Sequence, residues 1–450
     1  MTDLFNNPQR IECRLVLIDA HSMRILTTAS AAGPLLPRES IPAFTRIAEC
    51  LTEAIDRRYG LHTIQLALLP GADGLGYCAV HEIIDQPRDV PQSLSFSALN
   101  EIAATEFIGE ERVTVLAIMR GNAKELGRFA RLGWIDELFA RMGIHRGRRS
   151  MPAIRQLNQG IDFCLLSMTE ATGRKVWFKA VGEPNTREYA LTAELARRFP
   201  RYLPKMLATI PEWNGWVMED VQGSPLNEAN SIYQCEQALT ALAMMQQETA
   251  NDGASLSALG AKDWTCARVR SLLKPFFQDA RRAMQAQTSA KSTPLALSEL
   301  EQLQKDIESA LDAFMNAGIP ETLLHGDIGH GNILATCEGP VFLDWAEAAI
   351  GHPFLSAEHL LADLVRSDPL FARKQPAVRS HYAAHWKSFT GPETLGMITA
   401  LAPALAASAY AIMSWEISRD RPDPVESWPF MRSMLRRAKR EFEQASEAAV

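Results

Sequence analysis

One short segment, residues 322–348, constrains the chain most. It reads TLLHGDIGHGNILATCEGPVFLDWAEA and lies between two stretches of helical pattern. It places Asp327, Asn332 and Asp344 on short strands and on the tight loops between them. Two glycines, Gly329 and Gly331, allow the loop to fold back, so we expect Asp327 and Asn332 to face one cleft. A hairpin that turns through residues 338–340 would then deliver Asp344 beside them.

These residue types suit phosphoryl transfer. The reaction needs a carboxylate near the attacking hydroxyl, and oxygen ligands that hold Mg²⁺ against the phosphates of a nucleotide. A single Asp or Asn in a loop is usually ordinary turn chemistry, but this combination of three is specific. His330, inside the loop, has no role that the pattern assigns, and Mg²⁺ prefers oxygen to nitrogen.

The segment resembles the aminoglycoside phosphotransferase and choline kinase family. The family's HGD-x4-N motif is present as His325–Asp327 and Asn332, and its D-W pair as Asp344–Trp345. The resemblance implies a protein-kinase-like fold that uses ATP and Mg²⁺. It also implies that Asp327 is the catalytic base, that Asn332 and Asp344 are the metal ligands, and that His325 is a structural residue of the catalytic loop.

A kinase-like lobe upstream requires a lysine on its third strand for the nucleotide phosphates and a helix glutamate that holds this lysine. Lys179 in VWFKA fits the first role, and Glu188, nine residues on, fits the second. Glu194 is the rival partner, but the spacing within the family favours Glu188. We also expect a loop at residues 158–160, with Gly160, to offer backbone N–H groups to phosphate, and Glu219 to contribute main-chain contacts to adenine.

The sequence departs from the family after the D-W pair, where His352 replaces the aspartate of a G-D-P stretch. This change suggests a subgroup and leaves the metal ligands in place. Glu347 and Glu358 lie nearby in the sequence. They either recognise a cationic acceptor such as an amine or are plain solubilising groups.

Composition limits the partners of the protein. Among 450 residues, 46 Lys and Arg stand against 53 Asp and Glu, and a net charge of −7 argues against nucleic acid as the main partner. Seven scattered cysteines and an amino terminus without a signal pattern predict a cytoplasmic protein with reduced thiols. The uncharged stretch 395–415 predicts a buried core helix, with a membrane span as the alternative. The oligomeric state is left open.

The overall prediction is an α+β protein with three parts. Residues 1–145 form an accessory domain, with strands at 13–18, 64–69, 77–84 and 113–119 and a helix near 41–59. This domain loosely resembles a degenerate Nudix fold, in which Arg57 and Arg58 replace the metal-binding acids. A seam at Met142–Met151 leads to a kinase-like N-lobe at 150–220, with strands at 154–157, 163–168 and 176–180. A helical C-lobe fills 221–450, and its basic stretch 431–442 is expected to be a packing helix.

The predicted function is an ATP- and Mg²⁺-dependent phosphotransferase. It acts on a hydroxyl of a small molecule: an antibiotic, an amino alcohol, a sugar or a biosynthetic intermediate. A protein kinase is disfavoured because no D-F-G or A-P-E motif is present. The remaining alternative is a nucleotide-binding regulator or scaffold that transfers no phosphate.

Overall fold

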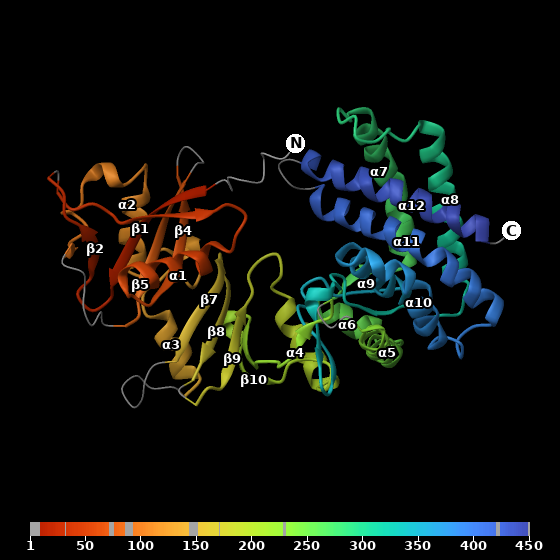
Figure 1. Cartoon of the computed structure of the whole chain (residues 1–450), viewed down its shortest axis with the longest axis horizontal. Coiled ribbons are helices and arrows are strands. Elements are labelled where there is room, and N and C mark those ends of the chain that lie inside the picture. Colours follow the sequence, from red (N-terminus) through yellow and green to blue (C-terminus); the bar gives the residue numbers. More distant parts are fainter. Residues whose placement is uncertain are drawn as a thin grey trace. The chain divides into compact units, whose positions relative to one another are not determined.

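The computed structural model describes residues 10–31, 33–71, 76–85, 93–143, 152–170, 172–227, 231–419 and 424–448. Their contacts divide the chain into two compact units (Figure 1). The first unit comprises Met1–Tyr189 and Lys205–Asp220, and the second comprises Ala190–Pro204 and Val221–Val450. The first unit therefore combines the expected accessory domain with most of the expected N-lobe. The boundaries at 145, 150 and 220 stay predictions, and most of the seam (144–151) lies outside the described residues.

A six-stranded sheet forms the amino-terminal half of the first unit, in the order β4 (Thr63–Pro70), β5 (Gly76–Ile83), β1 (Arg10–Asp19), β2 (Arg24–Thr28) and β6 (Leu94–Ser97). The sixth strand, β3 (Arg38–Pro42), also pairs with β1. Strands β1 and β5 run parallel, and their neighbours run antiparallel. The helices of this half are α1 (Ile47–Tyr59), α2 (Glu111–Met119) and α3 (Trp134–Arg141).

Sequence periodicity predicted some of these elements correctly and others not. Strands appear at 13–18, 64–69 and 77–84 as expected, and α3 ends before Gly143. The expected strand at 113–119 is wrong, because this segment is helix α2. Its buried residues Glu111, Val115 and Ile118 follow a spacing of four and three, which is the period of a helix. The helix expected near 41–59 begins only at Ile47, because residues 38–42 pair with β1 instead.

The second half of the first unit is an antiparallel sheet in the order β10 (Met206–Ile210), β11 (Gly215–Glu219), β9 (Lys175–Ala180), β8 (Phe163–Thr169) and β7 (Ala153–Gly160). The three apolar runs predicted for this sheet are confirmed. Phe129, from the amino-terminal half, packs edge-on against Phe178 of β9, with ring centroids 6.3 Å apart. Both rings belong to one buried cluster that also contains Val80, Trp134 and Trp213. The two halves of the unit therefore share a hydrophobic core.

The second unit is mainly helical. Its helices are α5 (Ile232–Glu248), α6 (Gly253–Leu259), α7 (Cys266–Gln285), α8 (Leu297–Met315), α9 (Phe354–Ser367), α10 (Gln375–Ala384), α11 (Pro392–Ser418) and α12 (Trp428–Ala448), and α4 (Glu188–Arg198) enters it from the first unit. Two small sheets lie among the helices: β12 (Ser224–Pro225), β15 (Ile333–Thr336) and β16 (Gly339–Phe342), and β13 (Lys262–Trp264), β17 (Ala349–Gly351) and β14 (Thr322–Leu324). Mixed helix and sheet content confirms the α+β prediction.

Helices α11 and α12, dark blue in Figure 1, pack side by side. Among the described residues, α11 alone is long and apolar enough to cross a membrane, but 61% of its most apolar window is buried inside the protein. This burial is what the core-helix interpretation predicts. Met431, Leu435, Ala438 and Phe442 of α12 are also buried, which confirms the expected packing helix.

Candidate active site

The candidate catalytic segment, residues 325–348, begins where β14 ends. The chain turns sharply at Gly326. This residue has φ 79°, and a Cβ built on it would lie 1.9 Å from the carbonyl oxygen of Glu347. Only glycine fits such a close approach. The turn therefore brings Asp327 next to the chain that follows Asp344.

His325 fixes the far side of this turn. Its side chain is fully buried, and its Nε2 lies 2.8 Å from the carbonyl oxygen of Leu343, which can only accept a hydrogen bond. Its ring lies against that of Trp345, with centroids 4.4 Å apart. The residue thus connects the catalytic loop to the strand end that carries Asp344, which is the buttress that the sequence assigned to it.

Asp327, Asn332 and Asp344 come together as the motif requires. The Asn332 amide donates to the Asp327 backbone carbonyl at 2.8 Å and to its carboxylate at 3.4 Å. The Leu343 N–H donates to the Asn332 carbonyl at 2.9 Å, so Asp344 follows directly beside this pair. Asp344 has φ 61°, an unfavourable conformation for a residue with a Cβ, and such strain is typical of functional sites.

The acids of this cluster perturb one another. Partial desolvation raises the pKa of the Asp327 carboxyl, the nearby charges of Asp344 and Glu347 add to the rise, and the Asn332 amide opposes it. The oxygen donors of Asn332 and Asp344 suit Mg²⁺. Among the described residues, no group of three or more His, Cys, Asp or Glu could hold a metal ion. A metal here would therefore need further oxygens from nucleotide phosphates or water.

A contact with helix α9 also holds the loop that contains His330. Asp363, on α9, accepts from the His330 backbone N–H at 2.7 Å and lies 2.6 Å from its ring Nδ1, and it also pairs with Arg366. His330 therefore has an anchoring role that the sequence did not reveal. Its partner lies 33 residues away in another element, and no local spacing signals it.

The predicted ion pair of the first unit is present. Lys179 Nζ on β9 lies 2.6 Å from Glu188 Oε1 on α4, and their side chains are 10% and 2% exposed. The Lys179 ammonium also lies 5.7 Å from the centre of the Trp216 ring. Glu194, the rival partner, pairs with Arg197 instead. The choice of Glu188 is therefore confirmed as a contact.

Gly160 does not lie in a loop as expected. It is the last residue of β7 and pairs with Phe163, in a strand whose register shifts between Gln156 and Asn158. The turn consists of Ile161 and Asp162 alone. The Asp162 carboxylate accepts from the backbone N–H of Arg128 at 2.7 Å and from its Nε at 2.9 Å, so the amino-terminal half of the unit holds this turn.

Glu219 is the last residue of β11. Its backbone N–H donates to the Lys205 carbonyl at 3.0 Å, and its carboxylate pairs with Arg174 at 3.0 Å. The predicted adenine contact would therefore have to use other main-chain groups at this position.

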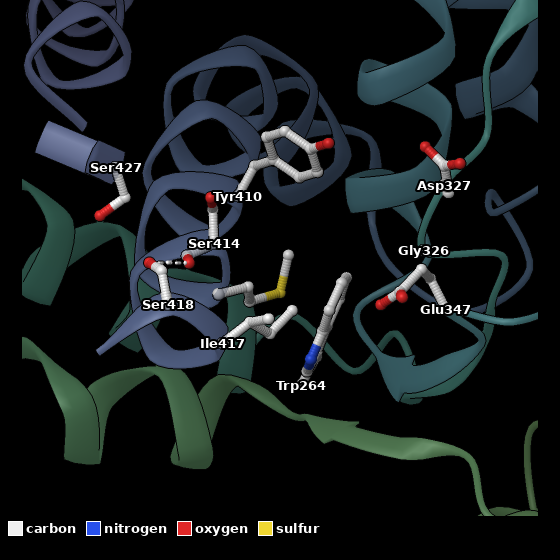
Figure 2. Close-up of a pocket in the computed structure, with 10 residues that line it drawn as sticks. Trp264, Gly326, Asp327, Glu347, Tyr410, Ser414, Ile417, Ser418 and Ser427 are labelled. Atoms are coloured by element: carbon white, nitrogen blue, oxygen red, sulfur yellow. Dashed lines mark hydrogen bonds between the residues drawn. The ribbon is translucent and has the colours of Figure 1, made fainter. Parts of the chain in front are cut away.

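A cavity of about 330 Å³ opens beside Asp327 (Figure 2). Figure 2 shows Tyr410, Ser414 and Ser418 in succession along α11, with Asp327 and Glu347 across the pocket. The complete lining is Trp264, Gly326, Asp327, Glu347, Tyr410, Met413, Ser414, Ile417, Ser418 and Ser427. Glu347 was one of the two acids that the sequence offered for acceptor contact, whereas the α11 residues were not expected individually, because their positions carry no motif.

The residues near the departure from the family pattern have structural partners. His352 is buried against Phe314, with ring centroids 4.4 Å apart, and burial lowers its pKa to about 3, so it is a neutral core residue. Glu358 is 2% exposed and makes two hydrogen bonds with Arg379. Glu347 forms an ion pair with Lys262. Glu358 is therefore a buried structural acid, and neither of the alternatives offered for it holds.

Sequence comparison finds a family match for the part of the chain that carries Asp327, Asn332 and Asp344. Residues 182–396 match the phosphotransferase enzyme family, APH. This match confirms the predicted resemblance and the predicted class of enzyme, a small-molecule kinase. No curated protein matches the sequence.

Solved structures of similar proteins include two kinases and an antibiotic-modifying enzyme. A choline kinase from Cryptosporidium parvum Iowa II is 13% identical, with a TM-score of 0.47, and the match covers 70% of this chain and 95% of that one. A choline/ethanolamine kinase family protein from Mesorhizobium loti is 12% identical, with a TM-score of 0.45 and coverages of 70% and 98%. A macrolide 2′-phosphotransferase from Brachybacterium faecium is 19% identical, with a TM-score of 0.42 and coverages of 67% and 98%.

Proposed function

We propose that the protein is an ATP- and Mg²⁺-dependent kinase that phosphorylates a hydroxyl of a small molecule bound in the cavity beside Asp327. The observation that carries this proposal is the position of the Asp327 carboxylate, which lines the cavity and is oriented by the Asn332 amide. A hydroxyl that enters the cavity meets a carboxylate base. A protein that only binds nucleotide has no need for this arrangement.

Each residue has a defined task in the proposed reaction. The acceptor hydroxyl attacks the terminal phosphorus of the nucleotide, its proton passes to the Asp327 carboxylate, and the bond to the bridging oxygen of the leaving nucleoside diphosphate breaks. Asn332 and Asp344 would hold Mg²⁺, which when bound neutralises charge on the phosphate oxygens. Lys179 binds phosphate oxygens through its ammonium, and Glu188 holds the lysine side chain in place.

We also propose a cytoplasmic location. All seven cysteines lie within the described residues and are free, and six of them are partly or fully buried. Free thiols are the usual state of cysteine in a reducing compartment. The small-molecule acceptor is the proposed partner, and nucleic acid is not.

A screen of metabolites and antibiotics tests the function directly. The full-length protein is incubated with Mg²⁺-ATP and pooled alcohols, and products are detected by a mass increase of about 80 Da, one phosphoryl group. Asp327→Ala serves as the matched control. We expect transfer to fall about 10³-fold in this variant, the usual contribution of a general base, while nucleotide binding by calorimetry is retained. Equal transfer by the variant would remove Asp327 as the base, and ATP binding without transfer to any alcohol would favour the regulator.

A further inference from the structure

We infer that the acceptor is an uncharged, hydroxyl-bearing molecule with an apolar face, not an amine or another cation. This inference rests on the proposed function and concerns the same cavity. It depends on the charges that line the cavity. The sequence offered Glu347 as a contact for a cation, but in the structure this acid is paired with a lysine.

The cavity has two carboxylates, and both are already engaged. Glu347 forms an ion pair with Lys262 on β13, and the two side chains are 31% and 35% exposed. Asp327 is oriented by Asn332 and is the group that must meet the acceptor hydroxyl. A cationic acceptor would therefore have to compete with the Lys262 ammonium for Glu347, and it would be repelled by that ammonium.

The wall opposite these carboxylates carries no charge. Helix α11 and Ser427 contribute hydroxyl groups, and Trp264, Met413 and Ile417 contribute apolar surface. Trp264 and Met413 are buried at 7% and 5% exposure, so their positions are fixed by packing. The Ser418 hydroxyl donates within its own helix to the Ser414 carbonyl at 2.7 Å, which leaves its oxygen able to accept a further hydrogen bond.

The charged residues at and just after the carboxyl end of α11 do not change this picture. Glu416 pairs with Arg268, and neither lines the cavity. Arg419 lies over the Trp415 ring. Placing an ammonium against this wall, on the side of the cavity away from Asp327, would remove its water without supplying a counter-ion, which is costly. A hydroxylated molecule with an apolar face can form hydrogen bonds with the hydroxyl groups of this wall and pack its apolar face against the apolar side chains.

Paired acceptors test the inference. The full-length enzyme receives Mg²⁺-ATP and alcohols in matched pairs, each pair consisting of a neutral alcohol and its amino or trimethylammonium isostere, such as 3,3-dimethylbutan-1-ol and choline. We expect the neutral members to have a kcat/KM at least about tenfold higher, equivalent to 1.4 kcal/mol of discrimination. A preference for the cationic members would overturn the inference while leaving the proposed function intact.

Lys262→Met releases Glu347 from its ion pair and supplies the sharper test. We expect the ratio of neutral to cationic kcat/KM to fall about tenfold in this variant, because a free carboxylate then faces the cavity. Lys262→Arg keeps the ion pair and should keep the wild-type ratio. An unchanged ratio in Lys262→Met sinks the inference. Absence of transfer to every alcohol, with the wild type equal to Asp327→Ala, sinks the proposed function instead.

Discussion

The catalytic segment and the amino-terminal sheet differ in how far apart in the sequence their interacting residues lie. In the catalytic segment, the partners that join Asp327 and His325 to the rest of the motif are near in sequence: Asn332 is five residues from Asp327, and Leu343 is 18 residues from His325. In the amino-terminal sheet, buried Arg14 makes two hydrogen bonds of 2.7 Å with Glu111, 97 residues away. The first arrangement leaves the Asp327 carboxylate at a cavity with an amide as its hydrogen-bond partner, and the second pairs a carboxylate with a buried arginine. The motif is therefore assembled mainly by short-range contacts, and the amino-terminal sheet is stabilised by a long-range ion pair.

The largest expected effect lies in the catalytic segment. Asp344→Ala removes one proposed Mg²⁺ ligand, so we expect the affinity for Mg²⁺-ATP to fall about 100-fold, because a bound metal contributes several kcal/mol of charge stabilisation. Titration calorimetry with and without Mg²⁺ measures this loss, and thermal unfolding should change little. Wild-type affinity in the variant would contradict the ligand role of Asp344. It would also remove the expected difference between the two regions in their effect on nucleotide binding.

Lys179 and Glu188 form a buried ion pair and are also proposed to act in phosphate binding, so their variants test both stability and activity. Lys179→Met leaves Glu188 buried without its partner, and we expect a loss of about 3 kcal/mol in the free energy of unfolding together with loss of transfer. In the double variant Lys179→Met, Glu188→Met, stability should return and transfer should not. Urea denaturation and initial rates separate the two effects. Transfer by the double variant would show that the pair only supports the fold.

The buried pair of the amino-terminal sheet should affect stability alone. Glu111→Gln weakens both bonds to Arg14, and we expect a loss of about 2 kcal/mol in unfolding free energy, since a buried charge is left without its counter-ion. Arg24→Ala is the matched control, because the pair of Arg24 with Glu101 is half exposed and should contribute at most about 1 kcal/mol. A reduced kcat in folded Glu111→Gln would break the division of roles.

The smallest effect concerns the contact that holds the catalytic loop. Hydrogen bonds from the His330 backbone and ring and from Arg366 lower the pKa of Asp363 despite burial. Its folded pKa lies below its unfolded value near 3.9, so its stabilisation is complete above that value and is lost as the pH falls through the folded pKa. Asp363→Asn should cost about 1 kcal/mol at pH 7. The difference from wild type should shrink as the pH falls below 4, and a difference independent of pH would contradict this origin.

The sequence predicted what depends on neighbouring residues. The hairpin at 333–342 and the strand of Lys179 follow from spacing within about ten residues, and the resemblance to the family selected Glu188 as the partner of Lys179. Contacts between distant elements could not be predicted. Lys262 and Glu347 are 85 residues apart, so nothing in the sequence indicated that this acid is neutralised. Gly160 was misplaced because a register shift within a strand has no signature in composition.

The shared core of the first unit limits how the protein can change. Phe178, the neighbour of Lys179, is covered by Phe129 from the amino-terminal half, and the buried glutamines Gln65 and Gln156 exchange hydrogen bonds at 2.7 and 3.1 Å. A recombination break near residue 150 would leave the strand of Lys179 with an exposed apolar face. The amino-terminal half of the first unit and the β7–β11 sheet therefore have to be exchanged together. We expect a chimera that contains only one of them to aggregate.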